Sequence, residues 1–274
     1  MIPDCQRWRE RRDTYRPAGE PIDTSRYGVE VVEQREAKPF VLQHHYSGSY
    51  PAARLAVGLW RKQPWLRPEL AGVAVFSVGV QPAAVKRWCG TPDAIELGRF
   101  VLLDDVPANG ETWFLRRAFA ELIATLPEVR ACLAYSDPVQ RASADGAIVL
   151  PGHVGTIYQA HNGRYVGRGT RRTIHLYPDG RAVSGRTETK IRKGEKGAGP
   201  EIDRLVAAGA RCPRLGEDPV MWLDEVLHAP PFRALRHPGN HAYVWPVDGR
   251  KSTTKLLAPN AGAYPKRVDA ITSP

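Results

Sequence analysis

The sequence predicts an α+β fold with a mixed sheet, because strand patterns and helix patterns alternate along the chain. The clearest stretch runs from Ile95 to Leu126, where a nearly continuous apolar run leads through a turn-rich break into a strongly periodic helix. Two other apolar runs, Leu70 to Val80 and Val129 to Tyr135, have the composition of buried strands. Strands and helices in such alternation build a single sheet covered by helices.

The first 100 residues predict an arm followed by the first strands. Residues 1–28 are polar, charged and proline-containing, which is typical of an irregular arm. A strand is expected over Gly28 to Ala37, a short helix or loop over Pro39 to Ala56, and a further strand over Leu55 to Trp60. The segment Pro82 to Pro92 is expected to be a connection.

The strand Ile95 to Leu103 and the helix that follows it are the best defined elements. Gly98 interrupts the apolar run, which indicates a bulge or a close backbone approach. The helix has an apolar stripe at i, i+3, i+4, i+7, i+8 and i+11, formed by Leu115, Ala118, Phe119, Leu122, Ile123 and Leu126. The loop Pro107 to Thr112 leads into its N-terminus, where unpaired N–H groups could bind an anion, although an ordinary turn explains the loop equally well.

The second half of the chain is predicted in less detail. The strand Val129 to Tyr135 ends in Ser136-Asp137-Pro138, a position where ligands collect in open sheets. A short helix is expected over Val139 to Ala144, a turn between two strands at Tyr177 to Gly180, a helix over Pro219 to His228 and a strand at the end of His237 to Trp245. The polar tail from Asp248 is expected to be loose.

Composition excludes several classes of protein. The chain has 274 residues, 42% of them apolar, and no apolar run long enough to span a membrane. Its start has no hydrophobic signal-peptide core, so we expect a cytoplasmic protein. The four cysteines contain no CxxC pair, which argues against a disulfide framework or a zinc knuckle. A Walker loop and a GxGxxG motif are both missing from the sequence.

Positive charge is concentrated in one segment. Between Ala160 and Pro200 there are ten Lys or Arg against three acids, so about 40 residues carry +7 of the net +10. Tyrosines, histidines and glycines are interleaved with these cations. Such a segment fits a surface that follows phosphates, and the competing explanation is a merely solvated charged face.

Three polar clusters are candidates for chemistry: His44 to Ser47, Tyr135 to Asp137, and His153 with Tyr158. A lone His or Tyr near a strand end is more often structural than catalytic. Together, however, His, Tyr and Asp from three segments could supply an acid, a base and orienting groups, or ligate a metal. Ser47 and Ser136 have no GxSxG elbow around them, so a hydrolase ranks last.

These residues carry a resemblance to a known family. His45-Tyr46-Ser47-Gly48, the strand and helix Glu96 to Phe119, Tyr135-Ser136-Asp137 and Gly155-Thr156-Ile157-Tyr158 resemble the Mom family of phage DNA-modification proteins, over roughly residues 30–170. The resemblance implies an acetyltransferase-like fold of the Gcn5-related (GNAT) type, with a central mixed, mostly antiparallel twisted sheet flanked by helices. Together with the composition, it divides the chain into an N-terminal arm over residues 1–28, an acetyltransferase-like catalytic core over 29–170, and a basic strip with a C-terminal extension packed on the core over 171–274.

The implied activity is a DNA-modifying transferase that adds a carbamoylmethyl (acetamido) group to adenine N6, protecting phage DNA from host restriction in the cytoplasm of the infected bacterium. The implied catalytic set is His45, Tyr46, Ser47, Asp137 and Tyr158. Family members have been linked to iron through these positions, so the implied metal ligands are His45, Tyr46, Asp137 and Tyr158. Asp137 is the best candidate for the general base that accepts the N6 proton.

The donor of the transferred group is an open question at the level of sequence. Adenine N6 is a poor nucleophile, and its product bond goes to a methylene carbon, which requires an activated CH₂ donor or a redox step in which iron would act. Acetyl-coenzyme A or a related donor is expected at Val101, Leu102, Leu103, Asn109, Gly110, Glu111 and Thr112. The loop Pro107 to Thr112 nevertheless has only Asn109-Gly110 in place of a glycine-rich pyrophosphate loop.

The expected partner is double-stranded DNA, whose target base must leave the stack to be modified. The residues expected to hold its phosphates are Arg164, Arg168, Arg171, Arg172, Lys190, Arg192 and Lys193. A general acetyltransferase acting on a small amine or a protein, and a DNA-binding protein without catalysis, are the two alternatives. The sequence leaves open whether the chain forms a homodimer.

Overall fold

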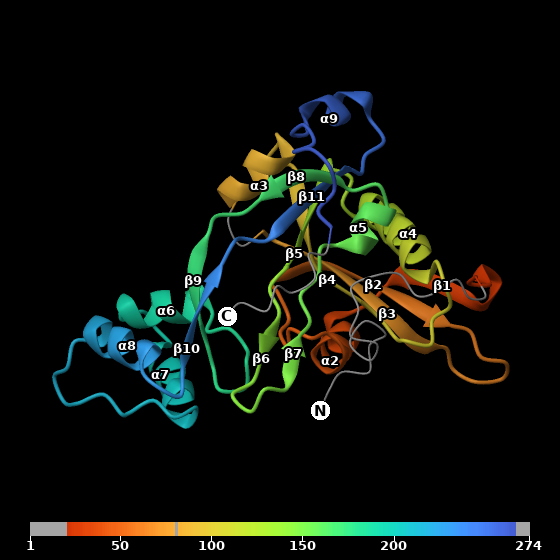
Figure 1. The fold of residues 1–274 in the computed structure, drawn as a ribbon. Helices are drawn as coiled ribbons and strands as arrows, with labels where there is room; N and C mark the ends of the chain where they lie inside the picture. The colour runs from red at the N-terminus through yellow and green to blue at the C-terminus, as the bar shows by residue number, and fades with distance from the viewer. Residues whose placement is uncertain (1–20, 80–81, 267–274) are drawn as a thin grey trace. The chain divides into compact units, whose positions relative to one another are not determined.

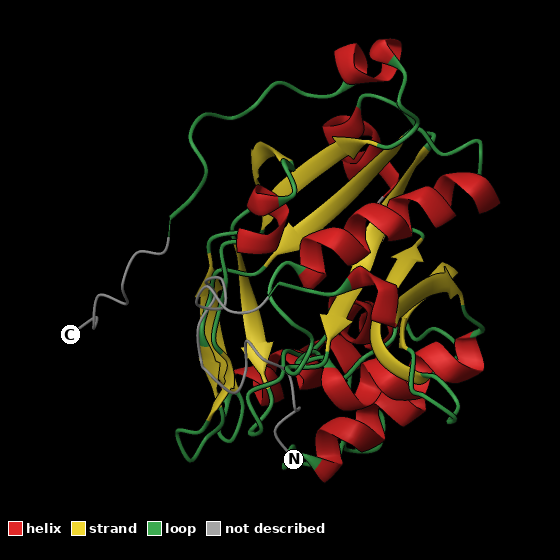
Figure 2. Ribbon diagram, turned by 90° about the vertical axis from the view of Figure 1, so that its right-hand side faces the viewer, coloured by secondary structure: helices red, strands yellow, loops and turns green. Residues whose placement is uncertain are grey.

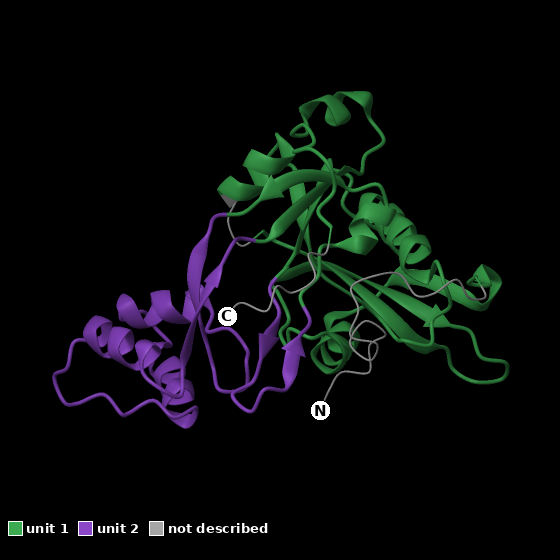
Figure 3. Cartoon of the chain, viewed as in Figure 1, with its two compact units in different colours: residues 1–138, 152–169, 240–274 green, residues 139–151, 170–239 purple. Residues whose placement is uncertain are grey.

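The computed structural model describes residues 21–79 and 82–266, and these form two compact units (Figure 3). The first unit comprises residues 1–138, 152–169 and 240–274, and the second comprises residues 139–151 and 170–239. The chain passes from the first unit to the second after residue 169 and returns to the first at residue 240.

A seven-stranded sheet organises the first unit. Its strands, in spatial order, are β1 (Tyr27–Val31), β2 (Ala53–Arg61), β3 (Glu69–Ser77), β4 (Ala94–Leu102), β5 (Ala131–Ser136), β11 (His241–Pro246) and β8 (Arg164–Arg168). Every neighbouring pair is antiparallel except β4 and β5. The predicted α+β class with a mixed, mostly antiparallel sheet is therefore confirmed.

Helices cover both faces of this sheet (Figures 1 and 2). On one face α4 (Gly110–Thr125) buries Phe114, Leu115 and Leu122 among side chains of β2, β3 and β4. On the opposite face α2 (Gln34–His44) buries Ala37 and Val41 among valines of β3 and β4. This unit also contains the helices η1 (Thr24–Arg26), α3 (Pro82–Cys89), α5 (Thr156–Ala160) and α9 (Lys251–Leu256).

A bulge in β4 decides which of its side chains face the site. Leu97 packs in the core under α4, whereas Val101 packs under α2, although residues four apart on a regular strand point to the same face. The change occurs at Gly98, where the register with β3 shifts between Val75 and Phe76. A Cβ at Gly98 would lie 2.5 Å from the Oγ of Ser77, so the predicted bulge and close approach are both confirmed.

Strands β4 and β5 pair only at their beginnings. Their parallel ladder joins Ala94 to Ala131, Ile95 to Cys132 and Glu96 to Leu133, and the rest of both strands is not paired with the other. Beyond Glu96, β4 therefore has a sheet partner on one side only, whereas β5 pairs with β11 along its whole length. The β4–β5 pairing ends just before the bulge at Gly98, so Arg99 lies on the part of β4 that is not paired with β5.

The second unit has its own small core. A ribbon of β9 (Arg172–Leu176) and β10 (Arg233–His237) accompanies the helices α6 (Gly185–Arg192), α7 (Ala198–Ala207) and α8 (Pro219–His228). Apolar side chains of the three helices, including Ile191, Leu205 and Trp222, are fully buried together. The short hairpin of β6 (Arg141–Ala142) and β7 (Ile148–Leu150) completes the unit. The predicted helix Pro219 to His228 is confirmed by α8.

Two predicted elements near the N-terminus are corrected by the structure. The strand expected over Gly28 to Ala37 ends at Val31, and residues 34–37 belong to α2, because Ala37 and Val41 are four apart and face the core together. The connection expected over Pro82 to Pro92 contains α3, whose Val85 and Cys89 show the same spacing and are buried. The predicted arm is described only from residue 21 onward.

Two predictions in the second half are also corrected. The short helix expected over Val139 to Ala144 is extended instead, because Asp145-Gly146 turns the chain into the β6–β7 hairpin, with Gly146 at φ 88°. The tail from Asp248 is ordered over its described part: the Asp248 carboxylate accepts a hydrogen bond from Thr253 Oγ1 at 2.6 Å, and Leu257 is buried. The turn at Tyr177 to Gly180 is confirmed, although its second arm makes only one bridge, at Ala182.

Among the described residues, no helix combines the length and the apolar character that a membrane span requires.

Candidate active site

The segment after α2 places a histidine and a tyrosine in one cluster. His45 is buried, and its Nδ1 accepts a hydrogen bond from the Ser47 backbone N–H at 3.1 Å while lying 2.9 Å from Ser47 Oγ. Because Nδ1 is an acceptor, the neutral ring carries its proton on Nε2. The ring of Tyr46 lies against that of His45, with centroids 4.2 Å apart. Ser47 thus orients His45 rather than standing free as a nucleophile.

Tyr46 connects this segment to the loop after β5. Its hydroxyl lies 3.3 Å from Nε2 of His153, and the two rings meet edge to face. His153 is buried, and its backbone N–H donates to the carbonyl oxygen of Asp137 at 2.7 Å. The sequence pointed to His153 only as a neighbour of Tyr158, and the structure makes it the link between Tyr46 and Asp137.

Tyr158 reaches the same region from α5. The helix begins after Gly155, whose φ of 78° favours glycine, and a Cβ there would lie 3.0 Å from Ser136 Oγ and 3.0 Å from the Tyr158 ring. Ser136 is fully buried at the end of β5, and its Oγ forms no hydrogen bond with any described residue. Gly155 therefore lets α5 pack directly on the end of β5, with Tyr158 and Ser136 side by side.

The structure adds Arg99, which follows the bulge in β4. Its Nε donates to the carbonyl oxygen of Ser49 at 2.9 Å, its Nη2 donates to Ser49 Oγ at 2.7 Å, and its Nη1 donates to the carbonyl oxygen of Gly98. Burial lowers the pKa of Arg99, and the negative charge available on Tyr46, Glu96 and Tyr158 acts in the opposite direction. The charge of Arg99 therefore interacts with both predicted tyrosines.

Arg99 was not predicted as a site residue, although the sequence contains a signal for it. A charged residue within a strand that is apolar on both faces needs a partner or a purpose. Arg99 directly follows Gly98, the residue that redirects the strand. The combination of an arginine and a glycine inside a buried strand could have identified it.

The cluster as a whole joins four segments at the point where β4 and β5 separate. Tyr46 comes from the loop after α2, Arg99 from the bulge of β4, Asp137 from the end of β5 and Tyr158 from α5. Arg99 is half-buried, and a cation bonded to neutral oxygens can stabilise an oxygen anion or a polarised carbonyl. The hydroxyl and imidazole of Tyr46 and His153 can pass a proton between them. The site therefore has the groups for a transfer reaction that moves one proton.

The chain matches a known family over most of these elements. The family model described as the Mom protein family matches residues 26–211, which is more than half of the 274 residues. The chain belongs to the Mom protein family. A search of curated proteins gave no match.

The match to the Mom family includes the whole cluster, from Tyr46 to Tyr158. It spans parts of both units and ends before α8 begins at Pro219. Strand β11, which pairs with both β5 and β8, lies outside the match. The sheet of this family member is thus completed by a segment that the family match does not cover.

The predicted donor residues fall into two groups. Leu103 donates its N–H to the carbonyl oxygen of Ala71 in β3 at 2.8 Å. In an antiparallel pair, successive residues direct their N–H groups to opposite sides of the strand. The N–H groups of Phe100 and Leu102 therefore point away from β3, toward the side of β5. The side chain of Val101 is buried under α2. Among these strand residues, Leu102 is the one placed to offer a backbone N–H to a donor.

The second group lies at the start of α4. Asn109 has φ 64° and makes no side-chain hydrogen bond to the helix, and Thr112 Oγ1 donates to the Asn109 carbonyl oxygen at 3.2 Å. Gly110 is buried, and a Cβ there would lie 2.5 Å from Val106. The first N–H groups of a helix have no partner within the helix, so this end retains the polarity of an anion seat.

The predicted iron ligands have other partners in the structure. His45 Nδ1 is bonded to Ser47 and the Tyr46 hydroxyl to His153. Within the described part of the chain, no three His, Cys, Asp or Glu side chains converge on a common point. Iron ligation by His45, Tyr46, Asp137 and Tyr158 stays a prediction.

The predicted phosphate-binding residues differ in how they are engaged. Lys190 and Arg192 form salt bridges with Glu201 and Asp224, each 3.1 Å long. Arg164 donates to the carbonyl oxygens of Leu257 and Ala258. The guanidinium of Arg168 lies 3.4 Å from Nε2 of His241. The remaining three residues are exposed and form no salt bridge with described residues: Arg171, Arg172 and Lys193. The last three are best placed to meet a phosphate.

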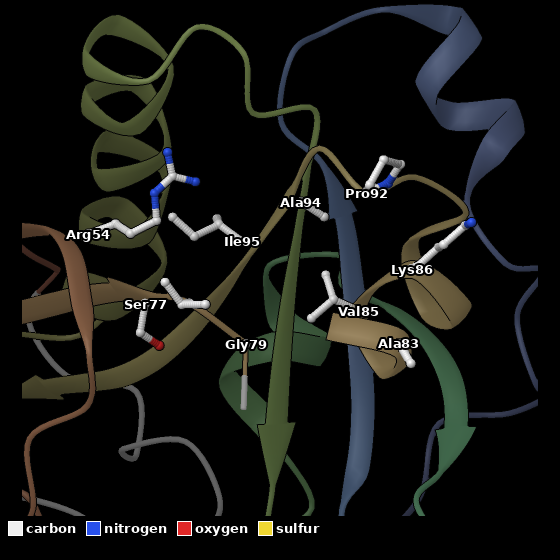
Figure 4. Close-up of a pocket in the computed structure, with 10 residues that line it drawn as sticks. Arg54, Ser77, Gly79, Ala83, Val85, Lys86, Pro92, Ala94 and Ile95 are labelled. Carbon is white, nitrogen blue, oxygen red and sulfur yellow. The ribbon is translucent and has the colours of Figure 1, made fainter. Parts of the chain in front are cut away.

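A cavity of about 410 Å³ lies near the beginning of β4. It is lined mainly by apolar residues, with Arg54 and Lys86 on opposite sides (Figure 4). Ser77 belongs to its lining and also contacts Gly98, but no side chain of the tyrosine and arginine cluster lines the cavity. Since Arg54 is already bonded to Glu128 at 2.8 Å, we assign the chemistry to the cluster.

Proposed function

We propose that this Mom family member is a DNA-modifying transferase that adds a carbamoylmethyl (acetamido) group to adenine N6 and so protects phage DNA from host restriction. The observation that carries the proposal is the position of Arg99, half-buried in the bulge of β4 where β4 and β5 cease to pair, with its charge interacting with Tyr46 and Tyr158. Membership of the Mom family supplies DNA as the substrate class.

The proposed donor site is the opening between β4 and β5. The N–H groups of Phe100 and Leu102 are directed toward this opening, and the N-terminus of α4 follows a few residues later. A chain of amides that ends at a helix N-terminus suits an extended donor with an anionic end. This arrangement supports the acetyltransferase-like fold, with a carrier that bears the carbamoylmethyl group, and a leaving group on its methylene carbon, as the donor.

The proposed reaction is a displacement on carbon. The target adenine leaves the base stack, and its N6 forms a bond to the methylene carbon of the activated donor. The bond from that carbon to the leaving group breaks, and the leaving group departs with the electron pair. N6 loses one proton. Atoms and charge then balance without a change of oxidation state.

The residues of the cluster have separate roles in this proposal. Asp137, half-buried at the end of β5, accepts the N6 proton. The pair of Tyr46 and His153 holds the flipped base and relays protons, since their polar atoms are 3.3 Å apart. Arg99 holds the carbonyl oxygen of the carbamoylmethyl group and stabilises negative charge that develops beside it. Tyr158 and Ser136 form the wall against which the base packs.

Nucleoside analysis tests the proposal directly. Plasmid is isolated from cells that express the protein, digested to nucleosides and examined by mass spectrometry. We expect a heavier adenine nucleoside with the wild type and none with Asp137→Ala. Soluble wild-type protein that leaves all nucleosides unchanged would refute the function.

Iron is tested separately, because the described contacts do not provide for it. Protein purified without a histidine tag is analysed for metal, comparing wild type with His45→Ala and Tyr158→Phe. Equal iron content in all three proteins would remove both residues as ligands. Iron that is lost with either substitution would mean that the side chains rearrange around the metal.

A general acetyltransferase is the second candidate, favoured by the diverging strands and the helix N-terminus. It requires tight binding of acetyl-coenzyme A, which calorimetry measures, together with transfer to an amine in the absence of DNA. A DNA-binding protein without catalysis would instead show salt-sensitive DNA binding that Asp137→Ala leaves intact.

A further inference from the structure

The loop between β2 and β3 ends in an exposed tryptophan. Trp65 is fully exposed, at 102% of its reference area, and its neighbour Leu66 is 69% exposed. Trp65 also has φ 65°, a conformation that costs free energy for a bulky side chain. The loop projects from the end of the two strands, drawn in orange (Figure 1). A large apolar ring is thus presented to solvent by a strained backbone.

The base of this loop is rigid, so the exposure of Trp65 does not come from a frayed segment. The Lys62 backbone N–H donates to the carbonyl oxygen of Arg26 at 2.8 Å, and the Lys62 ammonium donates to the carbonyl oxygen of Ser25 at 2.9 Å. Arg61 bridges Glu69 at 3.1 Å and Asp105 at 2.5 Å. These contacts fix both strands directly below the tip.

The charge around the tip favours an anionic partner. Arg61 is bonded to two carboxylates, those of Glu69 and Asp105, so the cations of residues 61–69 that remain without a carboxylate partner among the described residues are Lys62 and Arg67. Arg67 is exposed beside Leu66 and forms no salt bridge with described residues. A flat ring next to cations fits a polyanion that also offers flat apolar surfaces, and nucleic acid is the polymer with both properties.

The distance from the tip to the cluster has a meaningful length on DNA. Arg99 pairs with Val75 in β3, and Trp65 precedes Val75 by ten residues on the same hairpin. Trp65 lies in the turn before β3, so only the residues from Glu69 to Val75 are extended strand, and at roughly 3.3 Å per residue they span about 20 Å. One turn of duplex DNA is about 34 to 36 Å long. A duplex whose target base is at the cluster would therefore reach the tip within one helical turn.

We propose that the β2–β3 tip is a wedge that inserts Trp65, supported by Leu66, into duplex DNA within one helical turn of the modified adenine, while Arg67 contacts the adjacent phosphates. The proposal rests on the proposed function, which supplies the DNA. It assigns to this tip the task of holding the duplex while the target base is turned out elsewhere.

The test compares duplex binding and plasmid unwinding for variants of the full chain. Fluorescence anisotropy with duplexes of 40 and 12 base pairs measures affinity, and the linking number of closed plasmid relaxed in the presence of protein measures insertion. We expect Trp65→Ala to weaken binding of the long duplex by about tenfold, to leave the short one unchanged and to abolish unwinding. Trp65→Phe, which keeps a flat ring, should retain both.

Leu215→Ala is the matched control, because Leu215 is equally exposed, at 107%, and lies in the second unit. It should behave as the wild type. If Trp65→Ala matches the wild type in both assays, the wedge is refuted. If Trp65→Ala instead loses binding only to vesicles of anionic phospholipid, the tip binds lipid and the DNA assignment is wrong.

The same plasmids, digested to nucleosides, report on the proposed function independently. Trp65-dependent binding and unwinding with unchanged nucleosides would retain the wedge and reject the modification. A modified nucleoside together with no effect of Trp65→Ala would retain the modification and reject the wedge.

Discussion

Two arginines, one in each unit, show opposite uses of a cation. Arg99 of the first unit bonds to neutral oxygens of Ser49 and Gly98, and burial lowers its pKa. Arg211 of the second unit bonds to the carboxylates of Glu217 and Glu225, which raise its pKa. The charge of Arg211 is therefore cancelled in the folded protein, whereas that of Arg99 remains to act on a ligand. A half-buried arginine that is bonded to neutral oxygens instead of a carboxylate marks the site in this molecule.

The largest expected effect is the loss of Arg99. We expect Arg99→Ala to lower the yield of modified nucleoside by about 100-fold or more, because a group that stabilises developing charge is removed. Arg99→Lys should rescue little of this loss, since an ammonium cannot reproduce the planar fork that holds Ser49 and Gly98. Mass spectrometry of plasmid nucleosides measures both variants. Arg211→Lys is the matched control. An equal loss of product with that variant would contradict the assignment of Arg99, and not Arg211, to the reaction.

Tyr46 should have the next largest effect. Tyr46→Phe removes the hydroxyl that lies 3.3 Å from His153, while the ring contact with His45 is retained. We expect roughly ten- to 100-fold less product at unchanged thermal stability. Tyr165→Phe provides the control, because Tyr165 contacts His241 outside the cluster. Product at the wild-type level in Tyr46→Phe would remove the proton relay from the mechanism.

The Arg211 cluster should govern acid stability instead of activity. Hydrogen bonds from Arg211 lower the pKa of Glu217 to about 2, below its ordinary 4.5. A lowered carboxyl pKa stabilises the fold above the unfolded value, and this stabilisation is lost as the pH falls from 4.5 toward 2. Arg211→Met should therefore melt at a lower temperature at pH 7 and depend less on pH in that window. Circular dichroism melts across the range decide this, and an unchanged pH profile would contradict it.

A third arginine, Arg168, extends the comparison to a histidine. Burial, and then the charge of Arg168, lower the pKa of His241 to about 4. Below the ordinary value of 6.5 the unfolded chain binds a proton that the folded chain does not, so stability falls as the pH drops from 6.5 to 4. The slope is at most about 1.4 kcal/mol of unfolding free energy per pH unit. Urea titrations of His241→Gln should show a flatter profile, and a slope equal to that of the wild type would refute this assignment.

The smallest effects are expected from the exposed cations of the second unit. Arg172→Ala should weaken duplex binding evenly and reduce the slope of log K against log salt by about one phosphate contact. Lys190→Ala should change that slope less, because Lys190 is already bonded to Glu201 at 3.1 Å. Anisotropy at several salt concentrations compares the two variants. Equal slopes would show that salt bridges within the unit do not decide which cations meet DNA.

Local sequence determined the elements whose side chains show strong periodicity or continuous apolar runs. Strands β2 to β5 and helices α4 and α8 lie where they were predicted, because burial on one face or on both imposes a pattern that can be seen in the residues themselves. The bulge at Gly98 was predicted for a similar reason, since glycine within a buried strand has a local cause. The Mom family could be recognised from short motifs in a fixed order.

Tertiary structure alone decided how those elements combine. Strand β11 comes more than 100 residues after β5 and pairs with it, a long-range choice that no local pattern encodes. The division into two units follows from the same long-range pairing. Arg99 became a site residue only because the bulge turns it toward the loop after α2, where Ser49 accepts its hydrogen bonds. The direction of a side chain depends on the register of its strand, and that register is set by neighbours distant in sequence.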